Sequence, residues 1–186
     1  MSNEVRKIMI TTPPKTAKTT PPPKAKPQSG LEKLLYGQAP SLDPKTILKE
    51  LKKDETIQRV KRGEISLFND NLGPKVNQDK AVALIQRGLI TLGLMTVDTT
   101  KKHWWRKPIF WDNVDGGIAW GSYGDRTIAS VKQLQDLAKI DPKDGLEGQK
   151  FGSKTLKALE TALNAKAAGK DWKAAVKKAA DQNAFQ

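Results

Sequence analysis

An all-α fold is predicted by the sequence, for two reasons. Several segments carry apolar residues at steps of three and four, the spacing of one helix face, and residue types that begin or end helices flank these segments. No alternating pattern of strand length competes with them. The clearest segment begins at Asn77 and ends before Gly93; its apolar positions are Val82, Ile85, Leu89 and Leu92.

Three further helices are predicted in the second half of the chain. One covers residues 125–139, one begins at Ser153, because serine is a good N-terminal cap, and a weaker, alanine-rich one covers residues 171–183. The helix that begins at Asn77, the helix over residues 125–139 and the helix that begins at Ser153 are expected to pack as a bundle. The inward-facing residues of the three are, in order, Ile128, Val131, Leu134 and Ala138; Leu156, Leu159 and Leu163; and Trp172, Ala175, Val176 and Ala179.

A helix is also predicted over residues 43–62. Asp43 can cap its start, Pro44 fits the first helical position, and Gly63 follows as a stop signal. Its apolar stripe is imperfect, so we expect it to dock on a partner and not to form a core of its own. The stripe consists of Ile47, Leu48, Leu51, Ile57 and Val60.

The N-terminal region has the composition of an extended arm. Residues 11–30 contain six prolines, five threonines, four lysines and no acidic residue. Proline favours extended geometry, and such a segment buries too little apolar surface to fold alone. We expect either a linker or an arm that lies along neighbouring proteins of a large assembly.

A short duplication lies in the second half of the chain. Residues 123–131 (YGDRTIASV) align without a gap with residues 151–159 (FGSKTLKAL), and an Asp-Gly pair precedes each copy. Asp-Gly favours a tight turn, the aromatic residue can plug the bundle, and the glycine lets the chain bend into the helix. The threonine lies in the first turn, where its hydroxyl can bond backbone groups. The repeat predicts two paired helix starts.

The order of these motifs resembles the peptidoglycan-binding-domain family over residues 77–163. The resemblance implies a compact three-helix fold that holds cell-wall glycopeptide in a shallow groove. At the family positions Gln86 and Gln135, we expect side chains that satisfy backbone groups at helix junctions. The matching residues are Val82, Ile85, Gln86, Leu89, Leu92, Gly93, Asp115, Gly116, Tyr123, Gly124, Thr127, Val131, Leu134, Gln135, Asp144, Gly145, Phe151, Gly152, Thr155, Leu156 and Leu159.

The sequence departs from that family at an insertion over residues 94–114. Four of the five tryptophans lie in or beside it, together with a cluster of cations. Aromatic rings offer platforms for sugars, and cations suit the carboxylates of stem peptides. The same composition suits single-stranded nucleic acid, and the rings could also cover the core or a protein partner. The predicted ligand-binding residues are Trp104, Trp105, Arg106, Trp111, Asp115, Trp120, Tyr123 and Arg126.

These features divide the chain into four parts. We expect an extended arm over residues 1–42, a docking helix with its connector over residues 43–76, and the peptidoglycan-binding-like domain over residues 77–165. A basic helix follows over residues 166–186.

No enzymatic activity, catalytic residue, metal site or cofactor is expected. The chain has one histidine, His103, and no cysteine, so zinc sites with several imidazole ligands and cysteine nucleophiles are excluded. A muramidase needs two carboxylates at a set distance. The only glutamates of residues 77–165 are Glu147 and Glu160, in a predicted turn and a predicted helix.

The charge and the N-terminus complete the functional expectation. The net charge is +13, but residues 77–165 carry thirteen basic and ten acidic side chains, a weak excess for a nucleic-acid face. No apolar run has the length of a signal peptide or a membrane span. We therefore expect a protein made in the cytosol that binds the wall as part of a phage tail, virion or injection machine. A basic nucleic-acid-binding or packaging protein is the alternative.

Overall fold

A computed structural model of the chain describes residues 40–68, 78–96 and 121–186. These residues are mostly helical, so the predicted all-α class is confirmed. Residues 1–39 of the expected N-terminal arm lie outside the described residues. The helices are α2 (Pro44–Leu51), α3 (Glu55–Lys61), α4 (Asp79–Thr91), α5 (Asp125–Leu137), α6 (Pro142–Gly145), the 3₁₀ turn η1 (Leu146–Gly148), α7 (Ser153–Ala167) and α8 (Trp172–Asp181).

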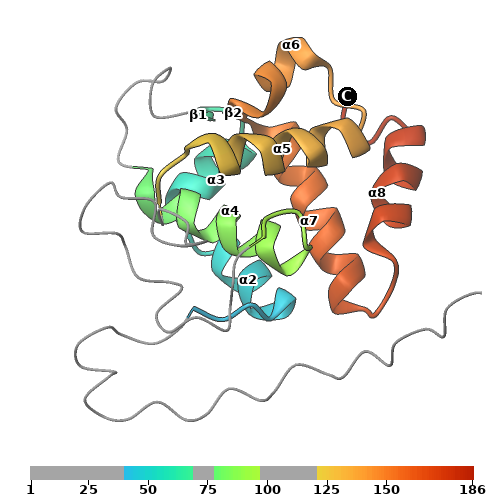
Figure 1. Cartoon of the computed structure of the whole chain (residues 1–186), viewed down its shortest axis with the longest axis horizontal. Helices are drawn as coiled ribbons and strands as arrows, with labels where there is room; N and C mark the ends of the chain where they lie inside the picture. Colours follow the sequence, from blue (N-terminus) through green and yellow to red (C-terminus); the bar gives the residue numbers. More distant parts are fainter. Residues whose placement is uncertain (1–39, 69–77, 97–120) are drawn as a thin grey trace, which may run out of the picture.

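Helix α7 lies at the centre of the fold (Figure 1), with α2, α3, α4, α5 and α8 packed against it. Its small and branched apolar residues face several neighbours at once, which is why the sequence of α7 is apolar on more than one side. Each of these side chains is at most 1% exposed: Leu156, Ala158, Leu159, Ala162 and Leu163.

The single helix predicted over residues 43–62 is wrong in one respect, because it is two helices. Helix α2 ends at Leu51, and Asp54 begins α3 by accepting a hydrogen bond from the backbone N–H of Ile57 (3.1 Å). An aspartate side chain competes for backbone donors, so it favours a cap over a helix interior. The stop predicted at Gly63 is confirmed by its left-handed backbone, at φ +75°.

The expected docking role of this region is also not what the packing shows. The apolar side chains of α2 and α3 are buried in the common core. Hydrogen bonds then fix α2 to α4: Arg87 pairs with Glu50 through Nη1 and Nη2, and its Nε donates to the Ser41 carbonyl (2.9 Å). Thr91 donates to the Leu42 carbonyl (2.8 Å). The apolar stripe of residues 43–62 therefore packs against other helices of the same chain.

The C-terminal helix belongs to the same core. Trp172 and Val176 of α8 are 7% and 0% exposed, and Phe185 beyond it is 3% exposed. Helix α8 packs along α7 and against α5. The expected divisions at residues 77 and 165 therefore do not separate independent cores. The common core extends from Ile47 to Phe185.

Two short strands connect the first helices to the second copy of the repeat. Strand β1 (Leu67–Phe68) pairs antiparallel with β2 (Lys150–Phe151), with Leu67 opposite Phe151. Both of these side chains are buried. Among the helices of the described ranges, none combines the length and the apolar character needed to cross a membrane.

Candidate functional site

The side-chain amide of Gln86, on α4, holds the start of α5. Its Nε2 donates to the Ser122 carbonyl (2.9 Å) and to Thr127 Oγ1 (3.1 Å), while its Oε1 accepts from the Gly121 N–H (3.0 Å). Gln86 is 1% exposed. Its amide therefore supplies partners for polar groups that the fold removes from water.

Gln135, on α5, holds the start of α7 in the same way. Its Nε2 donates to the Lys150 carbonyl (2.8 Å) and to Thr155 Oγ1 (3.1 Å), and its Oε1 accepts from the Gly148 N–H (2.9 Å). The expectation that Gln86 and Gln135 satisfy backbone groups at helix junctions is confirmed. We call each set a glutamine clamp: the glutamine, the glycine N–H, the carbonyl before the aromatic residue and the threonine hydroxyl.

The Asp-Gly pair of the second copy does not form the turn; its glycine instead leaves room for a neighbouring side chain. Asp144 and Gly145 end α6, and the left-handed turn follows at Leu146 and Glu147. A Cβ on Gly145 would lie 2.5 Å from Gln135 Oε1. Glycine is needed there because the clamp amide occupies that volume. The first Asp-Gly pair, residues 115–116, lies outside the described residues.

Tyr123 was expected to bind ligand, and the structure corrects this. Its side chain is fully buried, and its hydroxyl donates to the Gly148 carbonyl (2.7 Å), which belongs to the second clamp. Burial raises the pKa of Tyr123 well above the ordinary tyrosine value. Tyr123 thus joins the two clamps inside the core and has no surface to offer a ligand.

Six predicted ligand-binding residues lie outside the described residues. Of the residues that flank this part of the chain, Leu94 is bonded to α5 and Gly121 is bonded to α4. The Leu94 carbonyl accepts from Ser130 Oγ on α5 (3.1 Å), and the Gly121 N–H is held by Gln86 on α4. The segment therefore begins and ends on one pair of helices. The six residues are Trp104, Trp105, Arg106, Trp111, Asp115 and Trp120.

Arg126 is the predicted site residue that reaches the surface within the described ranges. It is exposed in the first turn of α5, two residues beyond the Gly124 that begins this helix. The corresponding residue of the second copy, Lys154, pairs with Asp144 (2.7 Å) and holds the pKa of that carboxyl below its usual value. The surface position after each clamp is therefore basic in both copies.

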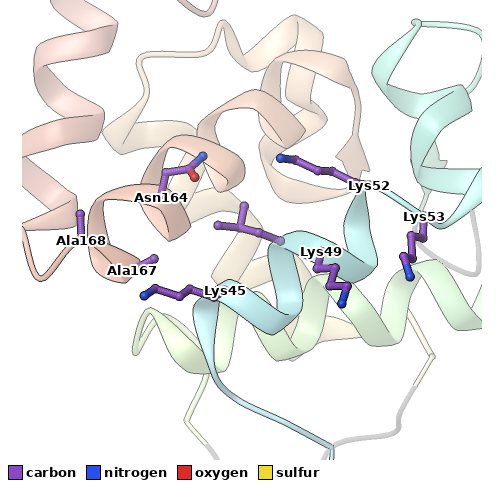
Figure 2. A pocket seen from close by; sticks show the side chains of 8 residues that line it. Lys45, Lys49, Lys52, Lys53, Asn164, Ala167 and Ala168 are labelled. Atoms are coloured by element: carbon purple, nitrogen blue, oxygen red, sulfur yellow. The ribbon is translucent and has the colours of Figure 1, made fainter.

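A second surface feature was not predicted from the sequence. An open groove of about 590 Å³ lies between α2 and the C-terminal end of α7. Figure 2 shows Lys45 and Lys52 extending toward the α7 side, where Ala167 and Asn164 lie, with Lys49 and Lys53 on the outer edge. Leu48 and Ala168 complete the lining. We call this the lysine groove.

The lysine groove contains no carboxylate among its lining residues. The acid on α2, Glu50, lies on the other side of the helix and pairs with Arg87, which lowers the Glu50 carboxyl pKa. The i, i+4, i+7 spacing of Lys45, Lys49 and Lys52 was a signal in the sequence, because it places them on one helix face. The sequence did not show that Glu50 pairs with Arg87 and so leaves these lysines without a carboxylate partner.

No cluster of three or more metal-ligating side chains occurs within the described ranges. Comparisons of the chain with family models, with curated proteins and with solved structures found no match. The resemblance to peptidoglycan-binding domains therefore depends on the sequence motifs.

Proposed function

We propose that the chain is a non-catalytic component that binds peptidoglycan or a related cell-wall glycan. The observation that carries the proposal is the pair of glutamine clamps at the motif positions of the repeat. Gln86, Thr127, Gln135 and Thr155 are motif residues with one shared structural task. A common task supports treating the motifs as one unit and not as scattered matches.

The ligand would meet the aromatic and basic segment between residues 96 and 121. Trp104, Trp105 and Trp111 supply flat apolar faces that suit sugar rings. Arg106 and the exposed Arg126 supply cations for the carboxylates of stem peptides. The clamp at Gln86 supports this proposal because it fixes Gly121, where the chain re-enters the fold.

We further propose that the protein works within a larger assembly, such as a phage tail, a virion or an injection machine that meets the wall at host entry. The support is the composition of residues 11–30, where prolines alternate with lysines and no acid is present. A chain of this composition stays extended and can follow the surface of neighbouring proteins.

The test is retention of the full chain on purified insoluble peptidoglycan at low and high salt. We expect retention at both salt levels, and a clear loss when Trp104 and Trp105 are both replaced by alanine. Leu146→Ala is the control, because Leu146 is an exposed apolar residue, 40% exposed, remote from that segment in the chain. The melting temperature of each variant should stay close to that of the parent.

Two results would contradict the proposal. If the double tryptophan variant melts much lower, the rings pack in the core, where truncation costs about 3–5 kcal/mol. If the chain shows no retention on peptidoglycan but binds DNA tightly at about 0.2 M salt, the nucleic-acid alternative holds, because phosphate contacts weaken steeply with salt.

A further inference from the structure

The lysine groove has more positive charge than its surroundings neutralise. Its four lysines are exposed and form no ion pair within the described residues. The carbonyl end of α7 lies beside them, where Ala168 caps the helix. A helix C-terminus carries only about half of one negative charge. Compensation of the helix dipole therefore accounts for a small part of four positive charges.

The residue types are those of a site that binds phosphate through charge alone. Lysine binds phosphate as a compact point charge, whereas arginine forms planar two-bond pairs with carboxylate and with phosphate alike. The arginines of the neighbouring helices are already paired with glutamates of this chain: Arg59 with Glu64, Arg62 with Glu55 and Glu64, and Arg87 with Glu50.

The lining also argues against a ligand that carries bases. Single-stranded nucleic acid is bound by cations together with aromatic rings on which bases stack. The lysine groove has no aromatic lining residue. Its apolar lining is aliphatic: Leu48 of α2, together with Ala167 and Ala168 at the C-terminal end of α7.

One polar side chain in the groove suits hydroxyl groups. The Asn164 Nδ2 donates to the Glu160 carbonyl one turn earlier (2.8 Å), which orients the amide. Within the described residues, no donor contacts its Oδ1. Lys45 and Lys52 lie seven residues apart, which is about 10.5 Å along the helix axis. The groove thus offers a row of cations, an aliphatic floor and a hydrogen-bond acceptor.

We propose that the lysine groove binds a linear phosphodiester polymer of the cell wall, built of repeating alditol phosphates. Phosphates would contact the lysine ammonium groups, the carbon chain would cover Leu48 and Ala167, and a polymer hydroxyl would donate to Asn164. The need for an anionic ligand follows from the groove itself. The choice of a phosphate polymer of the wall rests on the proposed function.

The experiment measures binding of poly(glycerol phosphate) to the full chain across a salt series. The test variant carries Lys45→Gln, Lys49→Gln and Lys52→Gln. The control carries Lys143→Gln, Lys177→Gln and Lys178→Gln, which removes the same charge from exposed positions that do not line the groove. Glutamine keeps helix propensity close to that of lysine, so both variants should melt like the parent.

We expect the groove variant to bind the polymer at least tenfold more weakly at low salt, and the control to stay within about twofold. The slope of log affinity against log salt should become shallower by about two, since each phosphate contact contributes roughly 0.7 on a single strand. Equal weakening by the groove and control variants would overturn the proposal, because net charge alone would then explain binding.

Two further measurements complete the experiment. The first compares two sources of phosphate, and the second distinguishes this proposal from the proposed function. A single-stranded oligonucleotide with the same number of phosphates should bind more weakly than the polymer; binding more than tenfold tighter would overturn the choice of polymer. Peptidoglycan stripped of phosphate polymers should retain the groove variant as well as the parent. If the stripped wall retains neither while groove-dependent polymer binding persists, the proposed function fails and the groove assignment stands.

Discussion

The starts of α5 and α7 are built alike, but the connections that precede them differ in length. Both use a glutamine clamp, a buried aromatic residue and a glycine with left-handed backbone, at φ +79° for Gly121 and +91° for Gly148. The second connection, from Ala138 to Gln149, is short and contains α6 and η1. The first includes the insertion over residues 94–114.

This difference shows what the clamp requires. Each glutamine bonds a glycine N–H and a backbone carbonyl within the last three residues before the aromatic residue. The clamp thus fixes the end of the connection, and a longer connection costs little additional free energy to close. Residues with a binding task can accumulate there while the helix start is kept.

The largest expected effect is on folding, and it tests whether the repeat folds without the helices that pack around it. A fragment of residues 77–165 contains both clamps but lacks α2, α3 and α8, whose apolar side chains cover α7. We expect no cooperative urea transition from this fragment, and a cooperative transition from residues 40–186. Circular dichroism at 222 nm during urea titration measures both. A cooperative transition of the shorter fragment would show that the repeat forms a domain without its neighbours.

Gly148→Ala should cost the next most. A Cβ there would lie 2.2 Å from the Ile128 carbonyl oxygen, and the backbone is left-handed. Overpacking and left-handed strain together predict a loss of about 2–5 kcal/mol in the free energy of unfolding. Gly63→Ala is the matched control, because its φ is +75° with open space around it; about 1 kcal/mol is expected. Equal losses from the two variants would mean that the second clamp tolerates movement of α5.

Replacing the clamp amides tests whether the two copies are energetically equal. Within the described residues, Gln86→Leu and Gln135→Leu each remove three hydrogen bonds at a helix start. At about 1 kcal/mol for each bond, both variants should lose roughly 3 kcal/mol of unfolding free energy. Urea titration of the full chain measures the losses. If Gln86→Leu costs under about 1 kcal/mol, the first clamp is a weak copy of the second.

The sequence predicted the helices of residues 77–163 and the repeat because both depend on local spacing. The roles of Gln86 and Gln135 were predicted from the family positions that these residues occupy. It failed where partners are distant. The stripe from Ile47 to Val60 shows that a face is buried but not that α7 covers it. In the same way, the spacing of the lysines on α2 can be read from the sequence. Their unneutralised positive charge cannot, because it depends on the pairing of Glu50 with Arg87, 37 residues away.

The smallest expected effect concerns the one hydroxyl that distinguishes the aromatic residues of the repeat. Tyr123 donates to the Gly148 carbonyl, while Phe151 has no hydroxyl. Tyr123→Phe should cost about 1 kcal/mol at neutral pH, the net value of one buried hydrogen bond. Urea titration at pH 7 measures this loss.

The same substitution has a pH dependence whose sign follows from burial. Burial raises the pKa of Tyr123 in the folded state, so the unfolded chain loses the phenol proton first, above its ordinary pKa of about 10. The stability that Tyr123 contributes is complete below that pH and falls above it. The advantage of the parent over Tyr123→Phe should therefore shrink by up to about 1.4 kcal/mol for each pH unit above 10. All other ionisable groups are common to both proteins, so their contributions cancel in the difference. A constant difference up to pH 11 would place the hydroxyl in contact with water and remove the link between the two clamps.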